Sequence, residues 1–231
     1  STWEVQGYSY PIYTNISYEF YSKNPLPPHV PYDYNPVGTY LTNINIPESF
    51  KGKNVFIHFG AVKSFFYIWL NGKYIGFSKD SKTPAEFDLT PYLIKGENTL
   101  ALEVFRWSDG SYLECQDMWR MSGINRDVFV YARPQTFVRD FFAKGNLKDN
   151  YTNGNLELDI LFNKLEAAEA QNLKLQVNLY EKNNTAKPVS SEIISLQQAV
   201  NSDSLHYEKR IPQVKKWTAE TPDLYVLTSS S

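Results

Sequence analysis

Cysteine is nearly missing from this 231-residue sequence, which contains only Cys115. One cysteine excludes a disulfide framework and any metal site built from several cysteines. Histidine is scarce too, and His29, His58 and His206 are too scattered to favour an all-histidine zinc site. No apolar run reaches the roughly 18 residues that a membrane span requires. The first residues show no basic segment followed by an apolar one, so no signal peptide is predicted.

An excess of charge of either sign is also missing. The chain has 23 Lys and Arg against 25 Asp and Glu, a formal net charge of −2. A nucleic-acid-binding domain typically carries a basic surface, and an acidic tail carries a run of like charges. We therefore expect neither a nucleic acid nor a membrane among the partners of this protein.

Aromatic residues, in contrast, are abundant: 17 Tyr, 14 Phe and 5 Trp make up 16% of the sequence. Aromatic side chains favour half-buried, pleated sheet surfaces, so packing in a β-rich fold is the ordinary explanation. The alternative is a role in ligand binding, because aromatic rings also stack on the apolar faces of sugar rings.

Short β-type runs separated by turn residues fill the region from 38 to 133. The pair Asn71-Gly72 between two such runs is the strongest local hairpin signal, because a type I′ turn needs positive φ at both positions. With no long helices between the runs, the pattern predicts an antiparallel sandwich. The expected strands are 40–46, 54–59, 65–70, 73–77, 85–89, 98–105 and 127–131.

Pro134 indicates a domain boundary, and a second, smaller set of β-type runs follows it. These runs are 137–143, 154–162, 173–180 and 205–211, and they predict a β-sandwich of immunoglobulin size. Residues 164–171 are expected to form a helical turn or a loop. Ser229–Ser231 are expected to carry no structure, and the second sandwich to be incomplete at its C-terminus. The chain is thus predicted to be all-β, with domains at 1–134 and 135–231.

Residues 7–18 are richer in special side chains than folding requires. Gly7 and Pro11 predict an irregular loop rather than a regular strand. Within it, the amide of Asn15 offers both a donor and an acceptor, which suits a sugar hydroxyl. The alternative, and the commoner case, is that Asn15 caps a turn by bonding to its own backbone.

A second unusual segment, Arg106–Asp127, connects two expected strands. Long polar loops between sheet strands are often functional, and Asp117 could bind a hydroxyl group or a hard cation through oxygen. Alternatively, the carboxylates brace the loop by pairing with its arginines. The carboxylates are Asp109, Glu114 and Asp117, and the arginines are Arg106, Arg120 and Arg126.

The same segment carries a family resemblance. Its first nineteen residues read Arg-Trp-Ser-Asp-Gly-Ser-Tyr-Leu-Glu-Cys-Gln-Asp-Met-Trp-Arg-Met-Ser-Gly-Ile. Together with Asn15 in Pro-Ile-Tyr-Thr-Asn-Ile-Ser-Tyr and with Lys79-Asp80-Ser81 before residues 84–89, this run resembles the large lactose-hydrolysing β-galactosidases of glycoside hydrolase family 2. The resemblance covers essentially the whole chain and is strongest over 7–133. The Gln-Asp-Met-Trp sequence favours a galactosidase over the glucuronidase and mannosidase branches.

The resemblance implies a five-domain parent enzyme, of which this chain matches the first two domains. These are a jelly-roll, galactose-binding-like sandwich and an immunoglobulin-like sandwich. The parent is expected to hydrolyse terminal β-D-galactosides such as lactose with retention. Its acid/base and nucleophile glutamates lie on a TIM barrel that nothing here matches, so no catalytic residue is expected in this chain, and the chain alone is expected to be inactive.

The resemblance also assigns binding roles. Asn15 matches an asparagine that reaches into the galactose site, and Asp117 matches an aspartate that binds galactose and a sodium ion. Asp109 matches a ligand of a peripheral magnesium site. Lys79 stands where the family has glutamine, which argues against that magnesium site.

The expected partners are therefore a galactoside, the catalytic barrel of the same polypeptide and, for the parent enzyme, further copies of itself. The compartment is expected to be the cytoplasm or the periplasm, because one cysteine fits both. Two alternatives remain open: a free-standing galactoside-binding module without hydrolase activity, and a purely structural domain whose loop carboxylates are all paired with arginines.

Overall fold

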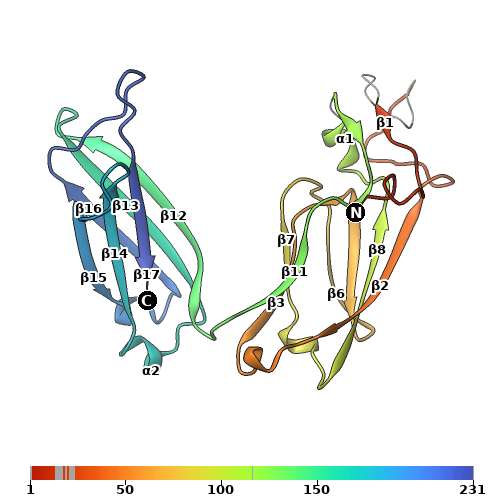
Figure 1. The fold of residues 1–231 in the computed structure, drawn as a ribbon, viewed down its shortest axis with the longest axis horizontal. Coiled ribbons are helices and arrows are strands. Elements are labelled where there is room, and N and C mark those ends of the chain that lie inside the picture. The colour runs from red at the N-terminus through yellow and green to blue at the C-terminus, as the bar shows by residue number, and fades with distance from the viewer. Residues whose placement is uncertain (1, 14–17, 19, 21–23, 116, 231) are drawn as a thin grey trace. The chain divides into compact units, whose positions relative to one another are not determined.

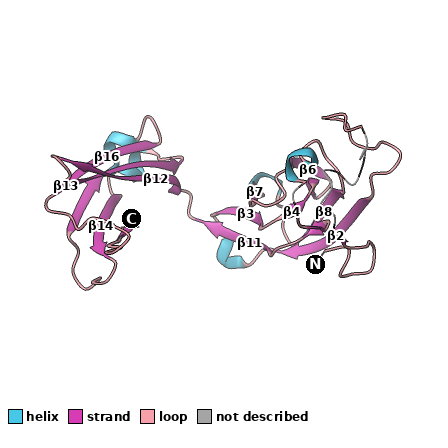
Figure 2. Ribbon diagram, turned by 90° about the horizontal axis from the view of Figure 1, so that it is seen from above, coloured by secondary structure: helices cyan, strands magenta, loops and turns pink. Residues whose placement is uncertain are grey.

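A computed structural model describes residues 2–13, 18, 20, 24–115 and 117–230. The chain folds as two compact units, Ser1–Pro134 and Gln135–Ser231. Antiparallel strands dominate both units and helices are short, as Figures 1 and 2 show. The predicted all-β class is confirmed.

Two facing sheets form the first unit. The larger has the strand order β2-β8-β5-β6 and the smaller β11-β3-β7. Their bounds are β2 (Val37–Asn45), β8 (Glu97–Phe105), β5 (Phe65–Leu70), β6 (Lys73–Ser78), β11 (Val128–Arg133), β3 (Asn54–Phe59) and β7 (Ala85–Asp88). Two 3-10 helices, η1 (Glu48–Phe50) and η2 (Thr90–Tyr92), lie in the connections. This is the arrangement expected of a jelly-roll sandwich.

Smaller elements complete this unit near its N-terminal segment. Two short antiparallel pairs join distant parts of the chain: β1 (Ile12–Tyr13) with β9 (Trp119–Arg120), and β4 (Val62–Lys63) with β10 (Gly123–Ile124). One helical turn, α1 (Ser111–Glu114), stands between β8 and β9. The segment that the sequence predicts as an irregular loop thus contains a two-residue strand, because β9 offers a free edge to Ile12 and Tyr13.

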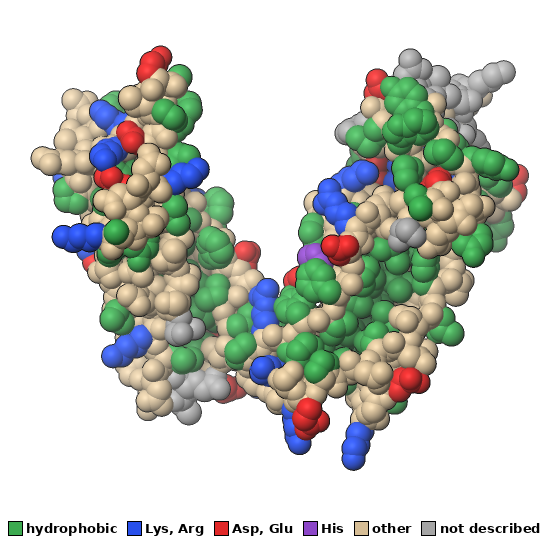
Figure 3. Space-filling model, in the orientation of Figure 1, with side chains coloured by type: hydrophobic (Ala, Val, Ile, Leu, Met, Phe, Trp, Pro, Cys, Tyr) green, Lys and Arg blue, Asp and Glu red, His purple; other side chains and the backbone are tan. Residues whose placement is uncertain are grey.

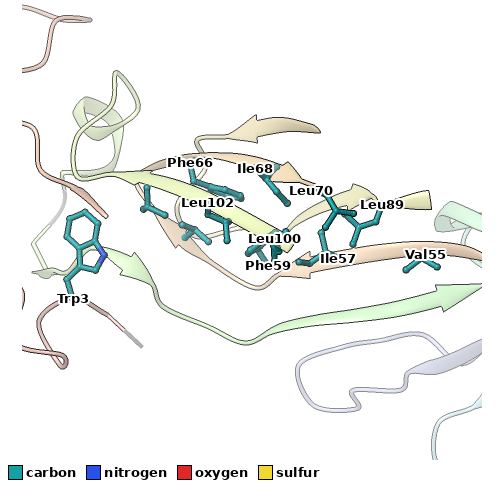
Figure 4. Close-up of a cluster of buried hydrophobic side chains, with 12 residues drawn as sticks. Trp3, Val55, Ile57, Phe59, Phe66, Ile68, Leu70, Leu89, Leu100 and Leu102 are labelled. Carbon is teal, nitrogen blue, oxygen red and sulfur yellow. The ribbon is translucent and has the colours of Figure 1, made fainter. Parts of the chain in front are cut away.

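The core of the first unit lies between its two sheets. Strand β3 buries Val55, Ile57 and Phe59, and strand β5 buries Phe66, Ile68 and Leu70, so every second residue points inward in each strand. Strand β8 adds Leu100, Leu102 and Val104 to the same cluster. Figure 4 shows these side chains together between the strands. Burial of this alternating set holds the two sheets against each other.

Aromatic rings also cover the outer face of the larger sheet. Phe65, Tyr67 and Trp69 alternate with the buried residues of β5 and therefore point away from the core. They contact the rings of neighbouring strands, with Phe65 5.7 Å from Phe105 and Trp69 5.9 Å from Tyr74 between centroids. Many other hydrophobic side chains reach the surface that Figure 3 displays. Cross-strand packing therefore accounts for much of the aromatic content.

The turn between β5 and β6 is the hairpin that the sequence predicts. Asn71 and Gly72 have φ values of 53° and 74°, as a type I′ turn requires. The Asn71 side chain donates to Asn98 Oδ1 at 2.8 Å and to the Tyr92 carbonyl at 3.0 Å, and it accepts from the Thr99 amide at 3.0 Å. The turn is thus tied to the start of β8 through side chains.

The second unit consists of two three-stranded sheets, ordered β12-β13-β16 and β15-β14-β17. Their bounds are β12 (Phe137–Lys148), β13 (Asn153–Asn163), β16 (Ser204–Ile211), β15 (Ser190–Ser195), β14 (Lys174–Glu181) and β17 (Tyr225–Ser230). The helical turns α2 (Ala167–Ala170) and η3 (Leu196–Ala199) pack near its core. Leu158, Ile160, Leu175 and Val177 from both sheets share one buried cluster, which makes this unit an immunoglobulin-like sandwich.

One expectation for this unit is wrong. Ser229 and Ser230 are not structureless, because they extend β17 and pair with Val177 and Gln176 of β14. The ladder is made by backbone groups, so a polar sequence at a sheet edge does not end it. Ser231 lies outside the described residues. None of the helices formed by the described residues has the length and apolar character needed to cross a membrane.

Candidate functional site

The connection from β8 to β11 is held at its start by polar contacts. The Asn35 side chain accepts from the Trp107 amide at 2.9 Å and donates to the Trp107 carbonyl at 3.1 Å. The buried guanidinium of Arg106 donates to Ser9 Oγ and lies 4.8 Å from the centre of the Trp107 ring. The first residues of the loop are therefore fixed against two segments far away in sequence.

The helical turn α1 is anchored by Glu114. Its carboxylate accepts from the Ser81 amide at 2.9 Å and from the Ser81 hydroxyl at 2.5 Å, and Ser81 is completely buried. On the other side of the turn, Tyr112 donates its hydroxyl to the His29 carbonyl and packs against Phe20. Glu114 thus has a structural role in joining α1 to the segment before β7.

Asp109, the second loop carboxylate, is paired with a lysine. Lys79 Nζ lies 2.8 Å from Asp109 Oδ2, and the Gly110 amide donates to Asp109 Oδ1 at 2.8 Å. The hydrogen bond from Lys79 is the main cause that lowers the pKa of Asp109 below its ordinary value. Asp109 is therefore held as a carboxylate whose charge is already compensated.

Asp117, the third loop carboxylate, lies exposed just before β9. The Tyr13 hydroxyl donates to Asp117 Oδ1 at 2.7 Å, although the two residues are 104 positions apart. The pairing of β1 with β9 places Tyr13 directly opposite Trp119, and the two rings are 5.4 Å apart. An exposed carboxylate and two exposed aromatic rings therefore share one surface.

The alternative in which arginines brace the loop carboxylates is not observed in the described part of the chain. The partners of Asp109, Glu114 and Asp117 there are Lys79, Ser81 and Tyr13, respectively. Two of the loop arginines instead contact other groups: Arg120 donates to Cys115 Sγ at 3.4 Å and Arg126 to the Lys82 carbonyl at 3.4 Å.

Asn15, the other predicted binding residue, lies outside the described residues. Strand β1 ends at Tyr13, two positions before Asn15, and it pairs with β9, which begins two positions after Asp117. That Asn15 and Asp117 share a site stays a prediction.

The two predicted metal positions differ in how well their residues fit an ion. Hard cations take several oxygen ligands, and Asp117 offers one carboxylate oxygen besides the one bonded to Tyr13. At Asp109, the ammonium group of Lys79 stands where a cation would sit, so these residues do not fit a magnesium site. Within the described ranges, no three His, Cys, Asp or Glu side chains are grouped closely enough to hold a metal ion.

Neither Tyr13 nor Ser81 is predicted from the sequence as a partner of the loop. Tyr13 belongs to the segment marked as unusual, but its neighbour across the strand pair is fixed only by the fold. Ser81 gives no local signal, because a serine before a turn is common in any protein.

Comparison with known proteins covers both units. The family described as "Glycosyl hydrolases family 2, sugar binding domain" matches residues 1–134, and "Glycosyl hydrolases family 2" matches residues 136–231. The chain is 43% identical over 232 aligned positions to a β-galactosidase of Priestia megaterium, and 42% identical over 237 positions to one of Vibrio vulnificus. Each alignment includes 100% of this chain and 22% of the relative. The chain thus spans about a fifth of the length of these curated relatives.

Solved structures agree with the fold. A β-glucuronidase of Bacteroides uniformis matches 85% of this chain and 24% of its own, with a TM-score of 0.66 and 22% identity. A β-glycosidase of Bacteroides vulgatus matches 84% of this chain and 23% of its own, with a TM-score of 0.59 and 24% identity. At this level of identity the likeness concerns the fold. The family matches over both units and the identity to curated relatives together show that this chain belongs to glycosyl hydrolase family 2.

Proposed function

We propose that this chain is the sugar-recognition and scaffold portion of a β-galactosidase that hydrolyses terminal non-reducing β-D-galactosides, such as lactose, with retention. The β-galactosidases that align with the complete chain support this proposal. The structural observation that carries it is the exposed carboxylate of Asp117, held by Tyr13 beside the ring of Trp119.

This combination of groups suits a sugar. A carboxylate accepts hydrogen bonds from ring hydroxyls, and an aromatic ring packs against the apolar C–H face of a hexose. The side chain of Trp119 is 57% exposed, so its ring is accessible. In our proposal Asn15 supplies a second polar contact to galactose, and Asp117 contributes one oxygen to a sodium ion bound with the sugar.

The chemical step is proposed to take place on another part of the longer polypeptide. A retaining glycosidase uses two carboxyl groups roughly 5–5.5 Å apart, one as acid/base and one as nucleophile. Among the described residues, the hydrogen-bond partners of the three loop carboxylates are a lysine, a serine and a tyrosine, so each carboxylate is used in a contact that the fold itself makes. The catalytic glutamates of the family's barrel domain would act on a galactoside whose orientation Asp117 helps to set.

The test compares the full-length gene product with its Asp117→Ala variant. We expect KM for nitrophenyl β-D-galactoside to rise at least about tenfold, because a hydrogen bond to a charged group contributes about 1.5–3 kcal/mol. Asp33→Ala removes an exposed acid of the same unit and serves as the matched control. Unchanged KM in Asp117→Ala would contradict the recognition role.

The 231-residue chain is tested separately. We expect no turnover of the same substrate by the purified chain. Turnover that persists through purification and disappears on Asp117→Ala would place the catalytic group in this chain and overturn the proposal.

A further inference from the structure

We infer that Tyr13 is a positioning residue for galactoside recognition, because its hydroxyl fixes the orientation of the Asp117 carboxylate. This inference rests on the proposed role of Asp117 in binding the sugar. It adds a second residue whose effect is exerted through Asp117 rather than by contact with the ligand.

Three independent contacts fix the position of Tyr13. Its backbone belongs to β1 and pairs with Trp119 of β9. Its ring packs against the Trp119 ring at 5.4 Å between centroids. Its hydroxyl donates to Asp117 Oδ1 at 2.7 Å. A donor held in this way is itself well positioned before any ligand binds.

Asp117 has less support of its own. It precedes β9 and belongs to no helix or strand, and its side chain is exposed. In the described part of the chain, the hydrogen bond from Tyr13 is its only side-chain partner. Without that bond, the carboxylate would sample several rotamers, and a sugar would have to select one of them.

The hydrogen bond leaves capacity for a ligand. A carboxylate has two oxygens with about four acceptor positions, and Tyr13 uses one of them. The bond to Asp117, and next the negative charge of that carboxylate, raise the pKa of Tyr13 above its ordinary value of 10.0. The tyrosine therefore keeps its proton, and remains a donor, throughout the neutral range.

The central variant is Tyr13→Phe in the full-length protein, which keeps the ring on Trp119 and removes the donor. The readout is the dissociation constant of isopropyl β-D-thiogalactoside, measured by titration calorimetry. We expect it to increase about threefold to tenfold, less than on loss of Asp117 itself, because the carboxylate stays in place and loses only its fixed orientation. The thermal midpoint should remain unchanged, because the exposed hydroxyl supports no buried group.

Tyr10→Phe is the matched control. Tyr10 lies three positions earlier in the same segment, and its side chain is 85% exposed. The Tyr10→Phe substitution therefore removes the same hydroxyl group from a tyrosine that does not hold Asp117. We expect Tyr10→Phe to bind isopropyl β-D-thiogalactoside with the same affinity as wild type. An equal loss of affinity in Tyr10→Phe and Tyr13→Phe would overturn the inference, since it would point to the segment as a whole.

The decisive measurement is a double-mutant cycle with Asp117→Ala, which removes the acceptor of the Tyr13 hydroxyl. If Tyr13 acts through Asp117, then Tyr13→Phe should change the affinity for the thiogalactoside by less than about twofold in the Asp117→Ala background. The same loss in both backgrounds would overturn the inference. If Asp117→Ala weakens binding and Tyr13→Phe does not, the inference is overturned while the recognition role of Asp117 stands. If Asp117→Ala leaves binding unchanged, the recognition role fails and the inference with it.

Discussion

Both sandwiches carry a charged pair across a ladder, and the first also has carboxylates on a loop. In the first unit, His58 of β3 lies 2.9 Å from Glu86 of β7, its register partner. Three further carboxylates of that unit gather on the connection between β8 and β11, and each is held by a neighbouring segment. The second unit has its own pairs on the strands. His206 of β16 bonds to Asp159 of β13 at 2.6 Å, directly across the ladder, and Glu192 of β15 accepts from Lys209 and from the Tyr207 hydroxyl.

The difference separates two uses of charge. A pair directly across a ladder satisfies both partners and stabilises the sheet modestly. A carboxylate on a loop, held from one side by a single donor, keeps acceptor positions for a ligand.

The largest effects belong to the two cores. Phe59 is completely buried in the first unit, and Leu175 is completely buried in the second. We expect Phe59→Ala to cost about 3–5 kcal/mol and Leu175→Ala about 2–5 kcal/mol in free energy of unfolding. In urea unfolding of the whole chain, each variant should shift the transition of its own unit only. An equal shift of one shared transition would show that the units are not independent.

Buried asparagines provide the next comparison. Asn98 is completely buried and accepts from the Ile94 amide at 2.9 Å, and it donates to the Gly96 carbonyl at 2.9 Å. We expect Asn98→Ala to cost about 3 kcal/mol, because these backbone groups lose their partner without access to water.

The counterpart in the second unit is Asn155, whose side chain donates to Glu157 and Glu208. Water can replace the amide at these more accessible carboxylates, so Asn155→Ala should cost only about 1 kcal/mol. The denaturant midpoints of Asn98→Ala and Asn155→Ala measure this difference in stability. Equal losses of stability would contradict the idea that the buried backbone groups bonded to Asn98 make its removal more costly.

The loop carboxylates are expected to differ from one another. Glu114→Ala leaves the buried Ser81 amide without its acceptor, for an expected loss of about 2 kcal/mol. Asp109→Ala removes a half-exposed pair with Lys79, for which less than about 1 kcal/mol is expected. The thermal midpoints of the two variants distinguish the buried contact of Glu114 with Ser81 from the half-exposed pair of Asp109 with Lys79. A larger loss in Asp109→Ala would reverse these assignments.

The smallest effect concerns the pH dependence of the His206–Asp159 pair. The hydrogen bond to Asp159 raises the pKa of His206 above 6.5, so its contribution is present below pH 6.5 and is lost as pH rises through the folded-state value. The same bond lowers the pKa of Asp159 below 3.8. The contribution of Asp159 to stability is therefore complete above about pH 4 and is lost as pH falls through the folded-state pKa of Asp159.

The pair therefore stabilises most between about pH 4 and pH 6.5. The difference in unfolding free energy between wild type and Asp159→Asn should be larger at about pH 5.5 than at about pH 8. Urea titrations at the two pH values test this, and His206→Gln should remove the pH dependence. A difference that grows toward alkaline pH would contradict the assignment.

Much of the fold can be predicted from the sequence where the signal is local. Alternation of apolar and polar residues identifies β8 and β14, and the pair Asn71-Gly72 identifies the hairpin. Such signals fail where neighbours determine the structure. Val62–Lys63 become β4 because β10 lies beside them, and Ser229 and Ser230 join β17 because β14 offers a ladder.

The candidate site shows the same limit. Its carboxylate-rich loop is evident from the sequence, and so is the family resemblance that assigns a role to Asp117. The hydrogen bond from Tyr13 is not evident, because it joins positions 104 residues apart and depends on the pairing of β1 with β9. The same holds for Ser81 and Glu114, which meet only in the folded chain.

The anchoring of the β8–β11 connection has a consequence for evolvability. Fixed points at Trp107 and Glu114 on one side, and at Trp119 on the other, leave a short stretch of chain between Glu114 and Trp119. If Asp117 has its proposed role, mutations at the exposed positions Asp117 and Met118 would alter the surface that meets the sugar while the fixed points hold the scaffold. A directed-evolution library for new glycoside preferences should therefore begin at these exposed positions.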